Sequence, residues 1–314
     1  MRLTKSELSF LSKVYKNSNP LSLFSGEGAV LQGNEEKLLE EKDILKGGRP
    51  VAEAHKLLST AADPQRCTRL VLKDGEYFVE KYAYKTNEDY VLVENDGGEL
   101  VFSSGEQLEE VLFQLSQWVG ISDFKTLDIN TALANDELIV FLSMADIRRE
   151  KELMSYLGQN VESRIPFSRI REQLEKPRPG SLTSILTGHY KYSIPDIENT
   201  KKILDRLIIA EIIGFQAGED QVGYFLVGAY EEFAEKFLIP QALVMLETFN
   251  HIEDKELAGA GVLCVWAGMR EIISLAFREG ATEIASISGR QLLKMMEEFL
   301  GCPDVRKVKD DQLP

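Results

Sequence analysis

Apolar and polar residues alternate along two separate stretches of the chain, and each stretch is followed by a helical pattern. Between residues 66 and 104, the apolar runs are separated by Asp74-Gly75, Asn87-Glu88 and Asp96-Gly97-Gly98. These are turn signals at hairpin spacing, so they predict four antiparallel strands. Residues 242–288 contain four further apolar segments, "ALVMLETF", "GVLCVW", "REIISLAFREG" and "TEIASIS". The pattern therefore indicates a second group of four strands.

The same motif, Ser-Gly-x-Gln-Leu, follows both groups of strands. It occurs at residues 104–108 and again at residues 288–292. In each copy the Ser and the Gln have the spacing of a capping box, in which each side chain bonds to the other residue's backbone N–H. Apolar residues then recur at helical spacing in both copies. We therefore predict one helix over residues 105–119, ending at Gly120, and a second one ending at Gly301.

Helical patterns precede each group of strands. Thr4 and Glu7 form a capping box before an apolar stripe. A second helix is predicted from about residue 34 to Gly47, and a third over "PVAEAHKLLSTAA", before Pro64. Residues 137–145, 203–214 and 224–240 repeat this order and are also predicted to be helical. We interpret the order as an internal duplication.

The predicted fold class is α+β, with two tandem repeats, each a four-stranded antiparallel sheet packed by helices, around a pseudo-twofold axis. Residues 1–125 form the first repeat and residues 126–314 the second. Residues 121–135 carry little periodic apolar signal, so we interpret them as a linker. A helical insertion is expected at about 150–195, with a loop at residues 176–180.

Charge and cysteine content restrict the classes of partner and compartment. The formal net charge is −15, from 36 basic and 51 acidic side chains. This balance opposes binding to nucleic acid or to an anionic membrane. The sequence has neither a secretory signal pattern nor a stretch of 18 apolar residues, so no membrane insertion is expected. Its three cysteines are far apart, which favours the reducing cytoplasm.

The sequence lacks the recognised motifs of catalysis, metal binding and cofactor binding. Its three histidines, His55, His189 and His251, are not at ligand spacing from one another or from a cysteine. The Gly-x-Gly at residues 26–28 follows no predicted strand, so it does not indicate a phosphate-binding loop. The pattern favours a protein-binding function over an enzyme, with no metal and no cofactor.

Two alternative functions stay open. One is a DNA-binding regulator that uses the helices of residues 35–62, and the other is an enzyme or small-ligand binder with a pocket between the repeats.

The order of elements resembles the EspG family of proteins associated with ESX (type VII) secretion. The resemblance lies in the opening "LTKSELSFL", in "EEKDILKGGRPVAEAHKLLSTAADP", in the strands that lead into a helix, and in "DELIVFLSMAD" at the start of the second half. It implies a cytosolic chaperone whose client is a secreted helical protein. In the family the client is a PE–PPE heterodimer, whose aggregation-prone helical tip the chaperone caps.

The resemblance also implies a binding surface made of a sheet loop and the helical part near it. The nearest candidate is the hairpin "YAYKTNEDY" at residues 82–90. Tyr82, Tyr84 and Tyr90 are aromatic residues beside a turn that contains Lys85 and Asn87, and aromatic residues are favoured anchors at interfaces. The alternative is that these tyrosines pack the sheet.

Overall fold

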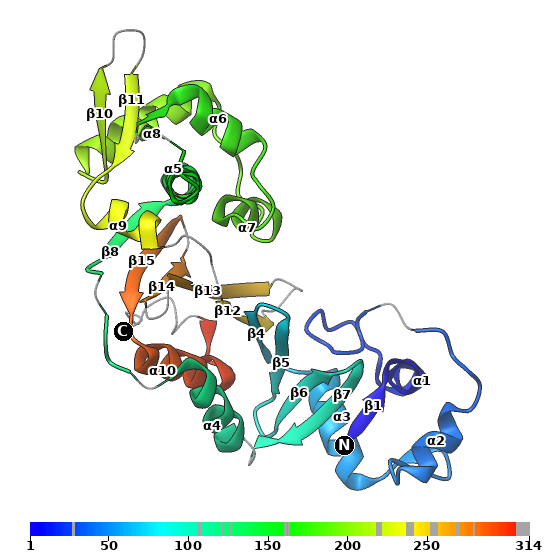
Figure 1. Cartoon of the computed structure of the whole chain (residues 1–314). Coiled ribbons are helices and arrows are strands. Elements are labelled where there is room, and N and C mark those ends of the chain that lie inside the picture. The colour runs from blue at the N-terminus through cyan, green and yellow to red at the C-terminus, as the bar shows by residue number, and fades with distance from the viewer. Residues whose placement is uncertain are drawn as a thin grey trace. The chain divides into compact units, whose positions relative to one another are not determined.

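The computed structural model divides the chain into two compact units. It describes all residues except 27–28, 106–107, 121, 126, 160–161, 163, 218–221, 237–241, 252–256, 268–270, 279 and 306–314. Unit 1 comprises Met1–Asp123, Ala242–Leu263 and Gly289–Pro314, and unit 2 comprises Phe124–Gln241 and Cys264–Ser288. Both units mix helices with antiparallel strands, which confirms the α+β class (Figure 1). The two repeats predicted from sequence are a different division of the chain, and they stay a prediction.

The sheet of unit 1 is built around the meander predicted between residues 66 and 104. Its strands are β4 (Arg66–Asp74), β5 (Tyr77–Lys85), β6 (Tyr90–Asp96) and β7 (Glu99–Ser104), joined by β1 (Arg2–Thr4), β12 (Ala242–His251) and β13 (Leu257–Ala267). Their order is β1-β7-β6-β5-β4-β12-β13. β12 pairs with β4 over nine residues, and the Thr68 hydroxyl donates to the Thr248 hydroxyl at 3.1 Å. The prediction of four meandering strands here is confirmed.

The helices of unit 1 are α1 (Lys5–Tyr15), α2 (Glu35–Glu41), α3 (Ala52–Ala62), α4 (Leu108–Val119) and α10 (Gly289–Leu300). A short hairpin of β2 (Leu45–Lys46) and β3 (Arg49–Pro50) links α2 to α3. The predicted capping box at the first helix is confirmed, because the Thr4 hydroxyl accepts from the Glu7 N–H and the Glu7 carboxylate accepts from the Thr4 N–H. Buried residues of α1, α2 and α3 pack on one face of the sheet around Leu11, Leu39 and Leu58.

The two helices that follow the Ser-Gly-x-Gln-Leu motifs, α4 and α10, contact each other in unit 1 (Figure 1). Both glycines of the motif lie where a side chain has little room. A Cβ on Gly289 would lie 2.6 Å from the carbonyl oxygen of Gly120, and one on Gly105 would lie 3.1 Å from the Tyr90 ring. The glycines therefore allow close packing. The first capping box includes Gln107, which lies outside the described residues.

Unit 2 is arranged around one long helix, α5 (Asn135–Tyr156). Residues 138–147 are all buried, so this part of the helix is covered on every side, as expected of a central helix. It contacts α6 (Phe167–Glu175), α7 (Leu182–Gly188), α8 (Ile197–Ile209) and α9 (Ala229–Lys236). Figure 1 shows α5 end-on among these helices.

The strands of unit 2 form two groups. β14 (Glu271–Phe277), β15 (Ala281–Ile287) and β8 (Asn130–Ala134) lie in that order, and β10 (Ile213–Ala217), β11 (Val222–Leu226) and β9 (Ile165–Pro166) form a separate small sheet. The strands predicted in "REIISLAFREG" and "TEIASIS" are confirmed as β14 and β15.

Several sequence interpretations are wrong. The helix predicted to reach Gly47 ends at Glu41, and Leu45–Lys46 form β2. The helix predicted over residues 203–214 ends at Ile209, and β10 begins at Ile213. Residues 224–240 are not one helix, because β11 precedes α9, and the aromatic, β-branched stretch of residues 222–226 pairs with β10. Residues 121–135 are not simply a linker, since they contain β8, whose Leu133 is buried.

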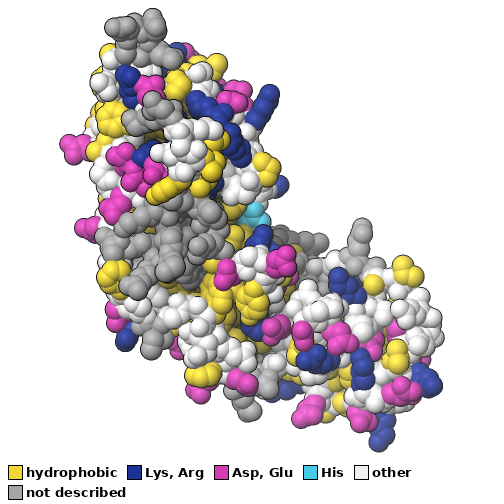
Figure 2. Space-filling model, viewed as in Figure 1, with side chains coloured by type: hydrophobic (Ala, Val, Ile, Leu, Met, Phe, Trp, Pro, Cys, Tyr) yellow, Lys and Arg dark blue, Asp and Glu magenta, His cyan; other side chains and the backbone are white. Residues whose placement is uncertain are grey.

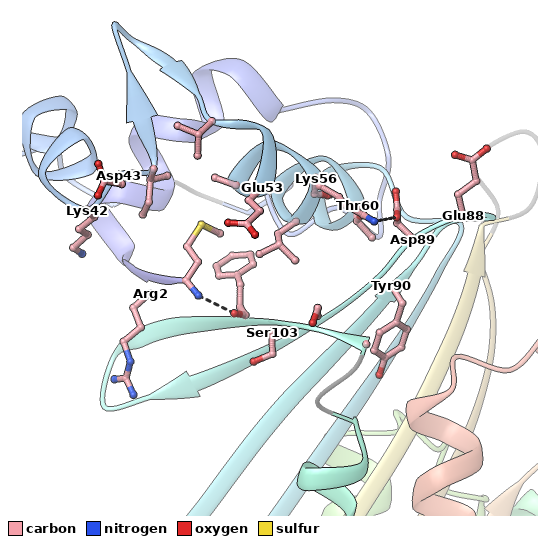
Figure 3. A pocket seen from close by; sticks show the side chains of 18 residues that line it. Arg2, Lys42, Asp43, Glu53, Lys56, Thr60, Glu88, Asp89, Tyr90 and Ser103 are labelled. Atoms are coloured by element: carbon pink, nitrogen blue, oxygen red, sulfur yellow. Dashed lines mark hydrogen bonds and ion pairs between the residues drawn. The ribbon is translucent and has the colours of Figure 1, made fainter.

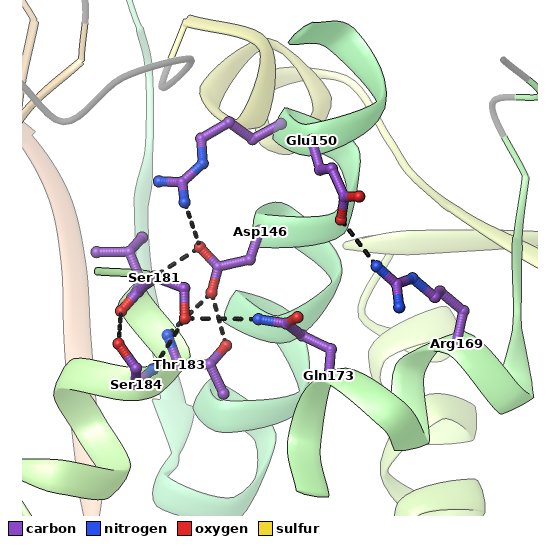
Figure 4. Close-up of polar contacts among 9 residues, drawn as sticks. Asp146, Glu150, Arg169, Gln173, Ser181, Thr183 and Ser184 are labelled. Carbon is purple, nitrogen blue, oxygen red and sulfur yellow. Dashed lines mark hydrogen bonds and ion pairs between the residues drawn. The ribbon is translucent and has the colours of Figure 1, made fainter. Parts of the chain in front are cut away.

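A buried carboxylate joins α5 to the start of α7 in unit 2 (Figure 4). The Asp146 carboxylate accepts hydrogen bonds from the Leu182 N–H at 3.1 Å, the Thr183 N–H at 2.9 Å and the Thr183 hydroxyl at 2.7 Å. It also lies 3.4 Å from the Arg149 guanidinium. The first N–H groups of a helix have no partner within the helix, so Asp146 supplies partners that α7 cannot supply itself.

Candidate functional site

The tyrosines predicted as binding residues lie at different depths in the β5–β6 hairpin of unit 1. Tyr84 is only 3% exposed and is part of the core beneath α1 and α3. Tyr82 is half-buried, and its ring stacks on that of Tyr84 with centroids 6.2 Å apart. The Tyr82 hydroxyl donates to the Glu80 carboxylate at 2.8 Å. Burial, together with this bond, raises the pKa of Tyr82 to about 12.

Tyr90 and Lys85 attach the base of the hairpin to the end of α10. The Tyr90 hydroxyl donates to the Leu300 carbonyl at 2.7 Å, and the Lys85 ammonium donates to the Gly301 carbonyl at 3.2 Å. The last carbonyls of a helix lack intrahelical partners, so both side chains cap α10. Burial, and secondarily the neighbouring Cys302, raise the pKa of Tyr90. Four of the five predicted residues thus make packing or capping contacts within unit 1.

The turn of the hairpin, residues 86–89, exposes two side chains. Asn87 and Glu88 are exposed, whereas the Thr86 hydroxyl accepts from the Asp89 N–H at 2.9 Å and fixes the turn. The Asp89 carboxylate forms an ion pair of 2.8 Å with Lys56 on α3. Asn87 is therefore the one predicted residue that the fold leaves exposed. Whether this hairpin binds a partner stays a prediction.

A groove of about 1130 Å³ opens beside the turn (Figure 3). One wall comes from α3, the opposite wall from the end of β7 and the hairpin, and one end from the segment before β2. Its apolar lining comes from Ile44, Val51, Ala54, Leu57 and Phe102. Phe102 and Ile44 are buried, so they form a floor. The groove is large enough for a drug-sized ligand or part of a protein segment.

The basic side chains of the groove all form ion pairs, whereas three of its carboxylates have no described partner. Lys42 pairs with the Glu7 carboxylate at 2.8 Å, Lys56 pairs with Asp89, and Arg2 pairs with Asp96 at 3.1 Å. Each basic side chain of the lining is therefore neutralised by an acidic one. The carboxylates of Asp43, Glu53 and Glu88 are exposed and pair with no described residue. Figure 3 shows the Glu53 side chain extending from α3 into the groove.

A second, smaller groove of about 480 Å³ lies between α4 and α10. It is lined by Leu112, Phe113 and Ser116 of α4 and by Arg290, Leu293, Lys294 and Glu297 of α10. Phe113 is 65% exposed, although α4 is amphipathic and buries Leu115. Unit 1 therefore carries two surface depressions with apolar linings.

The described residues were also compared with what a metal site or a catalytic cysteine requires. Among them, no group of three or more His, Cys, Asp or Glu side chains could hold a metal ion. The thiols of Cys67, Cys264 and Cys302 are free and buried. Burial raises the pKa of each thiol, to about 11 for Cys302, which suppresses the nucleophilic thiolate.

Basic and acidic side chains lie interspersed on the face shown in Figure 2. The pattern on that face differs from the continuous basic stripe typical of proteins that bind nucleic acid. In the part of the chain that the structure describes, no helix is long and apolar enough to cross a bilayer.

The sequence identified only the part of the groove lining that lies in the predicted hairpin, including Tyr90. Arg2, Asp43, Glu53 and Glu88 come from four different segments of the chain. The spacing of residues along the sequence does not show that these side chains meet in the folded protein. The turn signal at Asn87-Glu88 did locate the exposed tip next to the groove.

Comparison with known proteins identifies a fold. No protein-family profile matches the chain, and no curated protein matches it in sequence. The chain is similar to a solved structure, that of the Mycobacterium tuberculosis type VII secretion system chaperone EspG5 in complex with the PE25–PPE41 dimer. The similarity covers 96% of this chain and 95% of that chain, with a TM-score of 0.51 and 9% sequence identity. The fold expected from the resemblance to EspG proteins is therefore confirmed.

Proposed function

We propose that this protein is a non-catalytic, cytosolic chaperone or adaptor for a secreted helical client. The observation that carries the proposal is the shared fold, since nearly the whole chain follows the fold of a type VII secretion chaperone solved with a bound protein dimer. Fold alone does not determine function, so the chemistry of the surface must also fit. The buried, protonated thiols and the grooves with apolar linings favour binding over catalysis.

We assign the client contact to the tip of the β5–β6 hairpin and the groove of α3 and β7 beside it. Asn87 and Glu88 would touch the client directly. Tyr82, Tyr84, Lys85 and Tyr90 would support that contact by fixing the hairpin against the core and against the end of α10. A rigid support lowers the entropic cost of binding, because fewer side chains must be ordered when the client arrives.

The proposal includes the internal duplication. Four strands followed by a helix occur as β4–β7 with α4, and again as β12–β15 with α10. The contact between α4 and α10 adds support, because equivalent helices of a duplicated fold commonly face each other across an axis of pseudosymmetry.

The test is co-expression with secreted helical proteins encoded beside a secretion system, followed by size-exclusion chromatography with light scattering. We expect a complex of fixed stoichiometry that keeps the client soluble. Glu88→Lys, at the hairpin tip, should weaken the complex. Glu76→Lys makes the same charge change at the exposed β4–β5 turn and should not. If every candidate client elutes apart from the chaperone, the proposal is wrong.

A further inference from the structure

The groove beside the hairpin has an excess of unpaired negative charge around an apolar floor. Its three basic side chains are all engaged by carboxylates, and the Met1 ammonium, which also lines it, donates to the Phe102 carbonyl at 3.0 Å. The three carboxylates without a described partner, Asp43, Glu53 and Glu88, are exposed at its rim and outnumber this single ammonium. They lie on three different segments, so they surround the floor and do not form one acidic run. An occupant that matched this pattern would be apolar on one side and basic at its margins.

The dimensions of the groove suit a helical occupant. An α-helix has a diameter of about 10–12 Å and rises 1.5 Å per residue, so each residue occupies roughly 120–170 Å³. The groove volume of about 1130 Å³ therefore corresponds to about two helical turns. Two turns present two or three apolar side chains on one face, with flanking positions on both sides.

We propose that this groove binds a cationic amphipathic helix of the client. Its apolar face would cover Ile44, Leu57 and Phe102, and its Lys or Arg side chains would pair with Asp43, Glu53 and Glu88. The inference rests on the proposed chaperone function and specifies the chemistry of the client. It also gives a role to rim carboxylates that pair with no described residue.

The test uses the full chain and a fluorescein-labelled helical peptide of about 16 residues, with Leu on one face and Lys on the other. The triple variant Asp43→Asn, Glu53→Gln, Glu88→Gln removes the rim charges. The control variant Glu76→Gln, Glu109→Gln, Glu110→Gln removes three exposed carboxylates elsewhere in unit 1. Circular dichroism confirms that both variants fold.

Fluorescence anisotropy should show that the triple variant binds the peptide roughly tenfold more weakly, since each exposed ion pair contributes about 0.2–1 kcal/mol. The difference should shrink at high salt. The control variant should bind as the parent does. A Glu/Leu peptide of the same pattern, and a proline-interrupted version of the Lys/Leu peptide, should bind weakly.

Equal losses in the two variants would show that net charge alone attracts the peptide, and unchanged binding in the triple variant would exclude the rim. Equal binding of the proline-interrupted peptide would exclude a helical occupant. Each of these results overturns the inference.

Repeating the titration with the co-purified client distinguishes failure of the groove assignment from failure of the proposed chaperone function. If the client binds both variants equally well, the chaperone function stands and the groove assignment fails. If no client forms a complex, the chaperone function fails, whatever the peptide does.

Discussion

Replacing Asp146 by alanine should destabilise unit 2 more than any exposed charge change. The carboxylate is buried and accepts three hydrogen bonds from the first turn of α7, and hydrogen bonds to charged groups contribute about 1.5–3 kcal/mol each. Burial of the ionised carboxylate costs free energy that opposes this gain. Removing one partner of a buried charge pair typically costs about 3–5 kcal/mol, and alanine would leave the Arg149 guanidinium without its carboxylate. We expect a loss of about 3–5 kcal/mol.

Asp146→Asn separates the hydrogen bonds from the charge. The amide oxygen can still accept from the backbone of α7, so we expect a smaller loss, of about 1–3 kcal/mol. Burial raises the pKa of the Asp146 carboxyl, more than Arg149 and the Thr183 bonds lower it. Folding therefore favours the protonated carboxyl. Its contribution to stability is greatest below 3.8, the ordinary pKa, and is lost as the pH rises through the folded-state pKa. The cost of Asp146→Asn should accordingly shrink as the pH increases.

The assay is urea unfolding followed by circular dichroism, combined with hydrogen exchange of the α7 amides. Asp136→Ala is the matched control, because it removes a carboxylate of the same helix that is 48% exposed and pairs with Arg206. That change should cost less than about 1 kcal/mol. If Asp146→Ala and Asp136→Ala shifted the midpoint equally, or if the α7 amides stayed equally protected, the assigned role of Asp146 would be refuted.

Two further predictions concern the hairpin. Tyr90→Phe deletes the hydroxyl that caps α10 and should cost about 1 kcal/mol in urea unfolding. Tyr77→Phe, at an exposed tyrosine, should cost nearly nothing, and equal effects would contradict the capping role. Tyr82 should ionise near pH 12, because burial and its bond to Glu80 favour the protonated phenol, and its contribution to stability should be lost between about pH 10 and pH 12. The difference in absorbance at 295 nm between the parent and Tyr82→Phe measures this ionisation, and a value near 10 would show that Tyr82 is solvated.

The elements that the sequence predicted well are those specified by local chemistry. The turns at Asp74-Gly75 and Asp96-Gly97-Gly98 were located because glycine readily adopts a positive φ, and Gly75 and Gly97 have φ values of 58° and 61°. The elements that were missed depend on distant partners. β8 has five residues and one buried apolar side chain, so it is recognisable only beside β15. β11 runs into α9 with few polar residues between them, which made the whole stretch resemble one helix.

In the candidate site, too, the sequence predicts the local features but not those that depend on distant partners. Alternation along β5 shows that Tyr82 and Tyr84 share a face, but it does not show that this face lies beneath α1 and α3. Which carboxylates of the groove stay unpaired depends on where Lys42 and Lys56 find their partners, Glu7 and Asp89. Such pairings arise from the tertiary arrangement and have no counterpart in the spacing of residues.

The discontinuity of unit 1 has a consequence for biosynthesis. Thr68 and Thr248, neighbours on β4 and β12, are 180 residues apart in sequence, and α10 comes later still. A ribosome that has released only the first half of the chain therefore exposes an unpaired β4 edge and an uncapped tyrosine hairpin. Unit 1 can close only after β12 and α10 have emerged, whereas most of unit 2 precedes β12 in the chain. A chain that stopped after residue 123 would present an open strand edge, the feature from which aggregation commonly starts.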